Sequence, residues 1–220
     1  MTEPDAREIG DRLAAIYTGV LYDVVRDAGG SVDVLPHTIT SLENGGRLAG
    51  RVFTMSGRID ESLDTHTTMM EWTGLLGRAP KDHVMVCQPN DSTISHMGEL
   101  SAETLQGRGV RGYIVDGGCR DTDFIRDIKF PVWCRYTTPA DIRGRWVPEK
   151  LEEPIIIGGV QINNGDYVVA DRDGVLTLQP DNILDVIEAA EEAMQQESLV
   201  RAAIRAGTPP QEAYLKYRKF

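Results

Sequence analysis

Two polar segments of the chain contain residue types that could bind and activate a small anionic substrate. In "GYIVDGGCRDTDFI", residues 112–125, an apolar run gives way to glycines and then to Arg120 and Asp121. The glycines let the chain turn sharply and place Arg120 and Asp121 on the rim where the apolar strand ends, which is where ligands bind in open α/β sheets. For this dipeptide taken alone, a structural ion pair that closes a turn is the preferred interpretation, and a binding site is the alternative that the surrounding elements must support.

The second segment, "NDSTISHMGELSAETLQGRG", covers residues 90–109. Its pattern predicts a helix that begins near Gly98 and runs through Leu105 before two glycines end it. The first N–H groups of a helix lack partners and lie at the positive end of its dipole, and Gly98 and Ser101 leave room for an anion. A carboxylate pocket is therefore plausible here. An ordinary helix start is preferred unless Arg120 lies nearby.

The surrounding elements predict that these two segments meet. The apolar stretches 83–89 and 112–117 are typical of short buried strands, and the predicted helix lies between them in the chain. If the two strands are neighbours in a parallel sheet, the helix start and the end of the second strand lie at one edge. Ligands bind at that edge in open α/β sheets.

The rest of the chain shows the same mixture of helices and strands. Apolar spacing predicts a helix within residues 11–30 and strands at 50–57 and 131–136. Residues 153–180 indicate several antiparallel strands joined by Asn-Gly and Asp-Gly turns.

A long helix is expected near the C-terminus, with Asp181 as its N-cap and Gly207 as its end. We assign residues 1–220 to a single domain, in which residues 1–10 are flexible and residues 207–220 form a tail.

Composition excludes several classes of partner. The chain is 41% hydrophobic and 26% charged, as expected for a globular protein, and its net charge is −11. Phosphate backbones and anionic membrane surfaces would repel such a chain, so we expect neither a nucleic-acid nor a membrane partner. The polar start and the lack of about 18 consecutive apolar residues favour a cytoplasmic protein.

The three cysteines, Cys87, Cys119 and Cys134, form no CxxC pair, and each lies in or beside an apolar run. This placement predicts free, buried thiols rather than disulfides or a zinc site. Cys119 is the one cysteine that we expect to be exposed at the site.

Longer motifs of this chain resemble those of one known family. The sequences "GELSAETLQGRGVRGYIVDGGCRD", "GGVQINNGDYVVADRDGVLTL" and "RAAIRAGTPPQEAYLKYRKF" are similar to those of RraA-like proteins, and the resemblance covers nearly all the chain after about residue 10. That family includes class II pyruvate aldolases acting on 4-hydroxy-4-methyl-2-oxoglutarate and 4-carboxy-4-hydroxy-2-oxoadipate. The resemblance implies a layered β/β/α domain of the swivelling type, in the α/β class, assembled as a trimer or a dimer of trimers with sites between subunits.

The resemblance also implies roles for individual residues. Arg120 would bind the substrate keto oxygen, and Asp121 would bind a divalent metal, which is Mg²⁺ or alternatively Mn²⁺. Glu197 would reach the neighbouring subunit's site and orient a metal-bound water that transfers a proton. Glu191 and Glu192 are the alternative candidates for this role. The substrate carboxylate would be bound by backbone groups of Gly98, Glu99, Leu100 and Ser101.

These roles imply cleavage of a 4-hydroxy-2-oxo acid to pyruvate and a second carbonyl compound, with oxaloacetate decarboxylation as a further activity. A metal and an arginine can stabilise the enolate that such cleavage leaves. A Schiff-base aldolase would need a lysine in an apolar setting, but Lys129 falls at the wrong end of its strand.

The rival function is that of a regulator that binds ribonuclease E without catalysis. By resemblance, that regulator lacks the Asp after the Arg, so Asp121 favours the enzyme. Contacts of His66, Asp91 and His96 with substrate stay open, since a lone histidine is more often structural.

Overall fold

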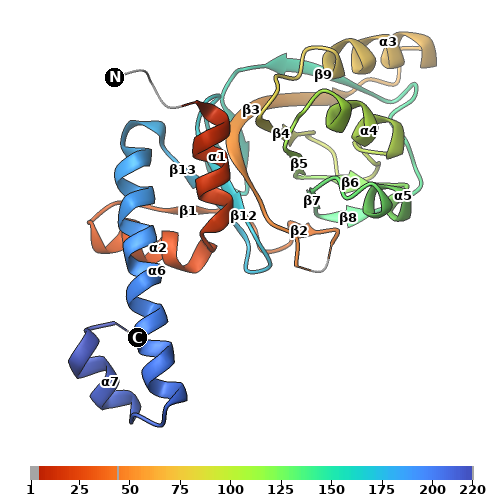
Figure 1. The fold of residues 1–220 in the computed structure, drawn as a ribbon. Coiled ribbons are helices and arrows are strands. Elements are labelled where there is room, and N and C mark those ends of the chain that lie inside the picture. Colours follow the sequence, from red (N-terminus) through yellow and green to blue (C-terminus); the bar gives the residue numbers. More distant parts are fainter. Residues whose placement is uncertain (1–4, 44, 220) are drawn as a thin grey trace.

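The structure is a computed structural model, and it describes residues 5–43 and 45–219. A nine-stranded sheet forms its centre (Figure 1), in the order β1-β13-β12-β3-β4-β5-β7-β2 with β9 paired to β3. β3, β4, β5 and β7 run parallel, which confirms the predicted strand-helix-strand unit. The strands are β1 Asp33–Val34, β2 Thr40–Ser41, β3 Leu48–Ile59, β4 His83–Gln88, β5 Gly112–Val115, β7 Val132–Cys134, β9 Trp146–Leu151, β12 Tyr167–Ala170 and β13 Val175–Leu178.

Helices cover one face of this sheet. α3 (Thr65–Leu76), α4 (Glu99–Gly107) and α5 (Thr122–Asp127) cover its parallel half. The antiparallel half packs against α1, α2 and α6, which span Ala6–Ala15, Thr18–Asp27 and Ile183–Arg205.

A hairpin of β10 (Ile155–Ile157) and β11 (Val160–Ile162) covers the opposite face. Side chains of β3 point alternately to the two faces of the sheet, which explains both layers. Ala49 and Phe53 belong to the hydrophobic clusters under the helices, whereas Leu48 and Val52 belong to the cluster under the hairpin. The expected layering of hairpin, sheet and helices in an α/β fold is confirmed.

The helix predicted within residues 11–30 is wrong in its continuity, because the chain forms α1 and α2 with a break at Ile16. Ile16 is extended, with φ −99° and ψ 135°. Asp171 explains the restart, since its carboxylate accepts from the Thr18 amide at 2.9 Å and from the Thr18 hydroxyl at 2.8 Å. Apolar spacing continues through the break, so no local signal marks it.

Three further features differ from the predictions: the start of α1, the N-cap of α6 and the position of the Asn-Gly turn. Residues 6–10 begin α1 rather than forming a flexible segment, while residues 1–4 lie outside the described part. Residues 180–182 form a 3₁₀ turn, so the N-cap of α6 is Asn182 and not Asp181. The Asn-Gly turn leads from β11 to β12, which do not pair with each other.

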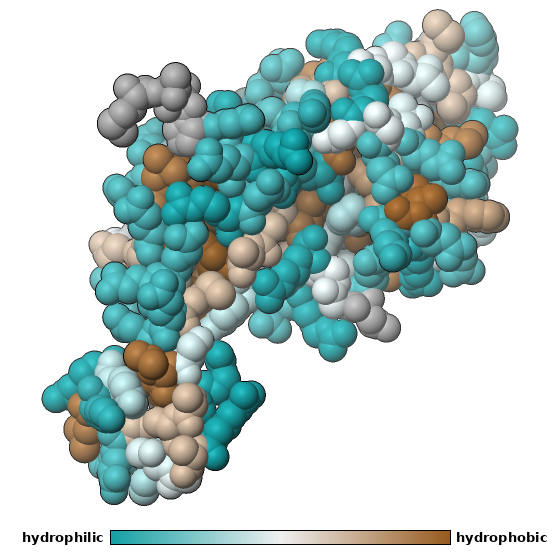
Figure 2. All heavy atoms as spheres, viewed as in Figure 1, coloured by the Kyte–Doolittle hydropathy of each residue, from teal (hydrophilic) through white to brown (hydrophobic). Residues whose placement is uncertain are grey.

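The C-terminal part projects from the domain as a helical arm. The end of α6 and the following α7, Pro210–Tyr217, lie away from the sheet, so the expected tail is largely helical (Figure 1). Figure 2 shows hydrophobic residues on this arm, and Leu199, Ile204, Tyr214 and Leu215 have large exposed fractions. No helix of the described residues is both long and apolar enough to span a bilayer.

Candidate active site

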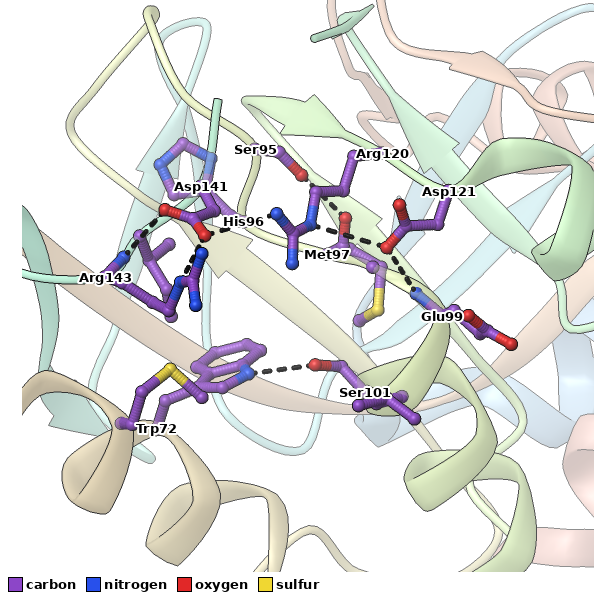
Figure 3. Close-up of a pocket in the computed structure, with 14 residues that line it drawn as sticks. Trp72, Ser95, His96, Met97, Glu99, Ser101, Arg120, Asp121, Asp141 and Arg143 are labelled. Carbon is purple, nitrogen blue, oxygen red and sulfur yellow. Dashed lines mark hydrogen bonds and ion pairs between the residues drawn. The ribbon is translucent and has the colours of Figure 1, made fainter. Parts of the chain in front are cut away.

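A pocket of about 400 Å³ lies where β4 and β5 end and α4 and α5 begin. Residues of α3 and of the loop before β9 complete its walls (Figure 3). The predicted residues that line it are Gly98, Glu99, Leu100, Ser101, Arg120 and Asp121. The structure therefore brings together all the predicted site residues except Glu197.

Backbone hydrogen bonds fasten the two loops that form the pocket. The His96 amide donates to the Gly118 carbonyl oxygen at 2.9 Å, and the Arg120 amide donates to the Met97 carbonyl oxygen at 2.9 Å. Gly118 allows this approach, because a Cβ there would lie 2.6 Å from the Ile94 carbonyl oxygen. The start of α4 is thereby fixed beside Arg120.

Arg120 lies between two carboxylates (Figure 3). Its Nε is 3.4 Å from Asp121 Oδ2, and its Nη1 donates to Asp141 Oδ2 at 3.2 Å. Asp141 Oδ2 also accepts from Arg143 Nε at 2.5 Å. These four side chains form a continuous charged row across the pocket, and the row holds the Arg120 guanidinium toward the cavity.

Asp141 keeps its negative charge despite being largely enclosed. Burial alone would raise the pKa of its carboxyl, but the hydrogen bond and charge of Arg143 and the charge of Arg120 hold that pKa below the usual range. Asp141 therefore links the two arginines as an anion at neutral pH.

The start of α4 leaves amide groups available to a ligand. Gly98 is its N-cap and provides no side-chain hydrogen bond, so the first amides depend on other partners. The Glu99 amide donates to Asp121 Oδ2 at 3.3 Å, and a Cβ at Gly98 would lie 2.8 Å from that oxygen. Trp72 Nε1 donates to Ser101 Oγ at 2.9 Å and fixes the helix start against α3.

Asp121 has the geometry of a single cation ligand. Its φ of 55° is left-handed, which is uncommon outside glycine, and it places the carboxylate between Arg120 and α4. Asp121 Oδ1 has no partner among the described residues. Within the same residues, no three His, Cys, Asp or Glu side chains gather as a metal cage. Mg²⁺ often uses one or two carboxylates with water and substrate, so this donor set fits that ion.

His96 supports the pocket from the interior. Its side chain is fully buried beside the Trp146 ring, its Nδ1 accepts from the Gly118 amide at 3.4 Å, and its Nε2 lies 3.4 Å from Asp91 Oδ2. Burial lowers the pKa of His96 to about 4 even though Asp91 opposes this shift. His96 is therefore neutral at physiological pH and connects the two loops.

The structure places the remaining predicted residues elsewhere. Glu197 lies on the C-terminal half of α6, where its carboxylate accepts from the Tyr17 hydroxyl and Arg201 lies 3.9 Å away. The contact of Glu197 with a neighbouring subunit stays a prediction. His66 is exposed on α3 outside the pocket lining, and the expectation of an exposed Cys119 is wrong because that thiol is buried.

Several lining residues had no signal in the sequence. Asp141 and Arg143 come from "ADIRGRW", which resembles an ordinary polar loop. Trp72 and Met69 come from α3, whose helical pattern indicates a core helix. Only the tertiary fold brings these two segments to the carboxyl edge of β4 and β5.

Comparison with known proteins identifies the family. The model of the RraA-like family, described as Aldolase/RraA, matches residues 18–177. The chain belongs to this family.

Relatives carry names of two functional kinds. A protein of Halalkalibacterium halodurans named as a candidate 4-hydroxy-4-methyl-2-oxoglutarate aldolase is 26% identical over 87% of this chain and 88% of its own. A Thermus thermophilus protein named 4-hydroxy-4-methyl-2-oxoglutarate aldolase is 25% identical over 66% of this chain and 84% of its own.

A solved structure from Streptomyces coelicolor, RraAS2, is described as an unusual member of the RNase ES inhibitor RraA family. It matches with a TM-score of 0.76 and 24% identity over 91% of this chain and 98% of its own. The sequence is therefore similar to those of relatives with aldolase names, and the fold is shared with a relative that has an inhibitor name.

Proposed function

We propose that this protein is a divalent-metal-dependent lyase that cleaves a 4-hydroxy-2-oxo acid to pyruvate and a second carbonyl compound. The observation that carries the proposal is the placement of Arg120 and Asp121 beside the open start of α4 in one pocket. The aldolase names of relatives support the same class of reaction. Decarboxylation of oxaloacetate is a further proposed activity, because it also leaves pyruvate in its enolate form.

In this proposal the 2-oxo carboxylate binds at the start of α4. The first amides of that helix and its dipole favour an anion, and Gly98 leaves space for it. This contact holds the pyruvate half of the substrate while the bond to the distal half breaks.

Arg120 stabilises the charge that develops on the keto oxygen. Asp121 and Asp141 fix its guanidinium through Nε and Nη1, and Nη2 has no partner among the described residues. A donor that is fixed before the reaction loses little energy to reorganisation when negative charge forms.

Asp121 is the proposed ligand of Mg²⁺ or Mn²⁺. A divalent cation bound there would supply further positive charge for a 2-oxo acid in the same pocket. Asp121 Oδ1 is open to such an ion, while Oδ2 stays near Arg120 and the Glu99 amide.

Proton transfer is assigned to Glu197 of a neighbouring copy in a homotrimer or a dimer of trimers. Glu197 would orient the water that exchanges a proton with the substrate. The apolar residues exposed on the arm of α6 and α7 support a contact between copies.

Regulation of a ribonuclease by protein binding is the second candidate, favoured by the likeness to RraAS2. The two functions differ in what they require of Asp121, which an enzyme needs and a binding protein does not.

The experiment is an assay of pyruvate release from 4-hydroxy-4-methyl-2-oxoglutarate and from oxaloacetate by the purified protein. Turnover of the first substrate supports the lyase. If neither substrate is turned over with any added divalent metal, the result would contradict the lyase function and favour the binding protein.

A further inference from the structure

The charged row of the pocket has a cation at the end opposite to Asp121. Asp121 contacts Arg120, Arg120 contacts Asp141, and Asp141 contacts Arg143. Figure 3 shows Asp121 beside the start of α4 and Arg143 on the far side of the cavity, near Trp72. A 2-oxo acid held at α4 and Arg120 would therefore extend toward Arg143.

Arg143 has an unused edge at this position. Its Nε is bound to Asp141 at 2.5 Å, whereas its two terminal nitrogens have no partner in the described part of the chain. The side chain is 59% exposed, so the guanidinium can be reached from solvent. Asp141 fixes one side of the guanidinium and leaves the edge whose donors match a carboxylate.

With a cation bound, the summed charge of the pocket is small, so recognition of a second carboxylate depends on the local position of Arg143 rather than on net charge. The lining contains two arginines and three carboxylates, which are Glu99, Asp121 and Asp141. A divalent ion at Asp121 would make the sum +1, which one carboxylate neutralises. A second carboxylate would be held by the terminal nitrogens of Arg143, because only Nε of that side chain is bound to Asp141.

We propose that Arg143 is a specificity-determining residue that binds a second carboxylate on the distal half of the substrate. This inference rests on the proposed lyase function for the orientation of the substrate. It selects dicarboxylic 2-oxo acids among the acids that the start of α4 and Arg120 would accept.

The test measures binding of two unreactive acids by calorimetry with Mg²⁺ present. 2-Oxoglutarate and 2-oxopentanoate have the same chain length and differ in the terminal carboxylate. The wild-type protein should bind 2-oxoglutarate more tightly, and Arg143→Gln should weaken that binding roughly 10- to 100-fold, as expected for a hydrogen-bonded charge. The affinity for 2-oxopentanoate should fall less than the affinity for 2-oxoglutarate, because Asp121 and Asp141 still contact Arg120 in this variant.

Arg145→Gln is the matched control, because Arg145 is exposed in the same loop and does not line the pocket. It removes the same charge and should change neither affinity. Arg143→Lys should keep part of the preference for 2-oxoglutarate.

Three results would overturn the assignment of Arg143: equal wild-type affinities for the two acids, failure of both acids to bind, and equal losses for both acids in Arg143→Gln. The last result would show that Arg143 acts only through Asp141 and Arg120. Arg143→Gln could selectively lose 2-oxoglutarate binding while the wild-type protein releases no pyruvate. That combination would support the binding role of Arg143 and reject the lyase function.

Discussion

At the residue scale, the proposed chemistry depends on the geometry of the Arg120 guanidinium. Asp121 and Asp141 orient it from two sides, which a single ion pair at a turn would not require. Arg120→Lys keeps the charge but loses the planar set of donors, so kcat for pyruvate release should fall by about 100-fold. Thermal unfolding should show a nearly unchanged midpoint.

Arg135→Lys provides a matched control for this substitution. Arg135 also pairs with a carboxylate, with Nη1 at 3.2 Å from Asp116 Oδ1, but it does not line the pocket. Its kcat should stay near that of the wild type. A fall in the unfolding midpoint with normal turnover in Arg120→Lys would indicate a purely structural pair.

His96 predicts how stability depends on pH. Burial lowers the pKa of His96 from its usual 6.5 to about 4, so between these values the unfolded chain binds more protons than the folded one. The folded state therefore loses free energy as pH falls from about 6.5 to about 4, by up to about 3 kcal/mol from this group.

Denaturant unfolding at pH 7 and pH 4.5 tests this prediction. The loss of unfolding free energy on acidification should be smaller in His96→Gln than in the wild type. His66→Gln, at an exposed position of α3, should lose as much unfolding free energy on acidification as the wild type. An unchanged loss in His96→Gln would show that His96 is not the titrating group.

At the element scale, the close approach of α4 to the Arg120 loop should require glycine at position 98. The backbone of Gly98 has φ −146°, which alanine can adopt, but a Cβ would lie 2.8 Å from Asp121 Oδ2 and 3.2 Å from Arg120 Nε. Gly98→Ala should therefore displace these side chains and lower kcat/KM at least about tenfold, while unfolding free energy changes by less than about 1 kcal/mol.

Gly74→Ala in α3 is the control, because no atom lies within 4 Å of its added Cβ. Steady-state kinetics and denaturant unfolding of both variants distinguish a steric effect in the pocket from the general effect of replacing glycine by alanine. Wild-type kcat/KM in Gly98→Ala would mean that the contact between α4 and Asp121 is dispensable.

Much of this arrangement follows from local sequence, and the rest does not. The apolar runs before Pro89 and Gly117 predicted the parallel neighbours β4 and β5, and thus the meeting of Gly98 with Arg120. The break at Ile16 and the arrival of Asp141 and Arg143 escaped prediction, because each depends on a partner distant in the chain.

At the scale of the whole molecule, the proposed assembly makes Asp121 and Glu197 partners from different copies. In the single chain, Glu197 accepts from Tyr17 on the helical side away from the pocket. If sites form between subunits, Asp121→Asn and Glu197→Gln should each be nearly inactive, and mixed oligomers should recover activity. In a trimer that contains both variants, about one interface in three combines both intact residues, so isolated mixed trimers should show about a third of wild-type pyruvate release.

Co-expression of the two variants with different affinity tags isolates the mixed oligomers for this assay. Oligomers that contain only Asp121→Asn are the control and should stay inactive. Demonstrably mixed oligomers without recovered activity would confine the site to one chain or exclude Glu197 from it.

The proposed lyase requires that Asp121 hold the divalent metal on which pyruvate release depends. The most direct measurement is pyruvate release from 4-hydroxy-4-methyl-2-oxoglutarate by chelator-treated protein, before and after Mg²⁺ is restored. We predict that chelation abolishes the activity of the wild type, that Mg²⁺ restores it, and that Asp121→Ala stays inactive at the same Mg²⁺ concentration while remaining folded. Full activity of the chelated wild type, or metal-restored activity of Asp121→Ala, would contradict the account.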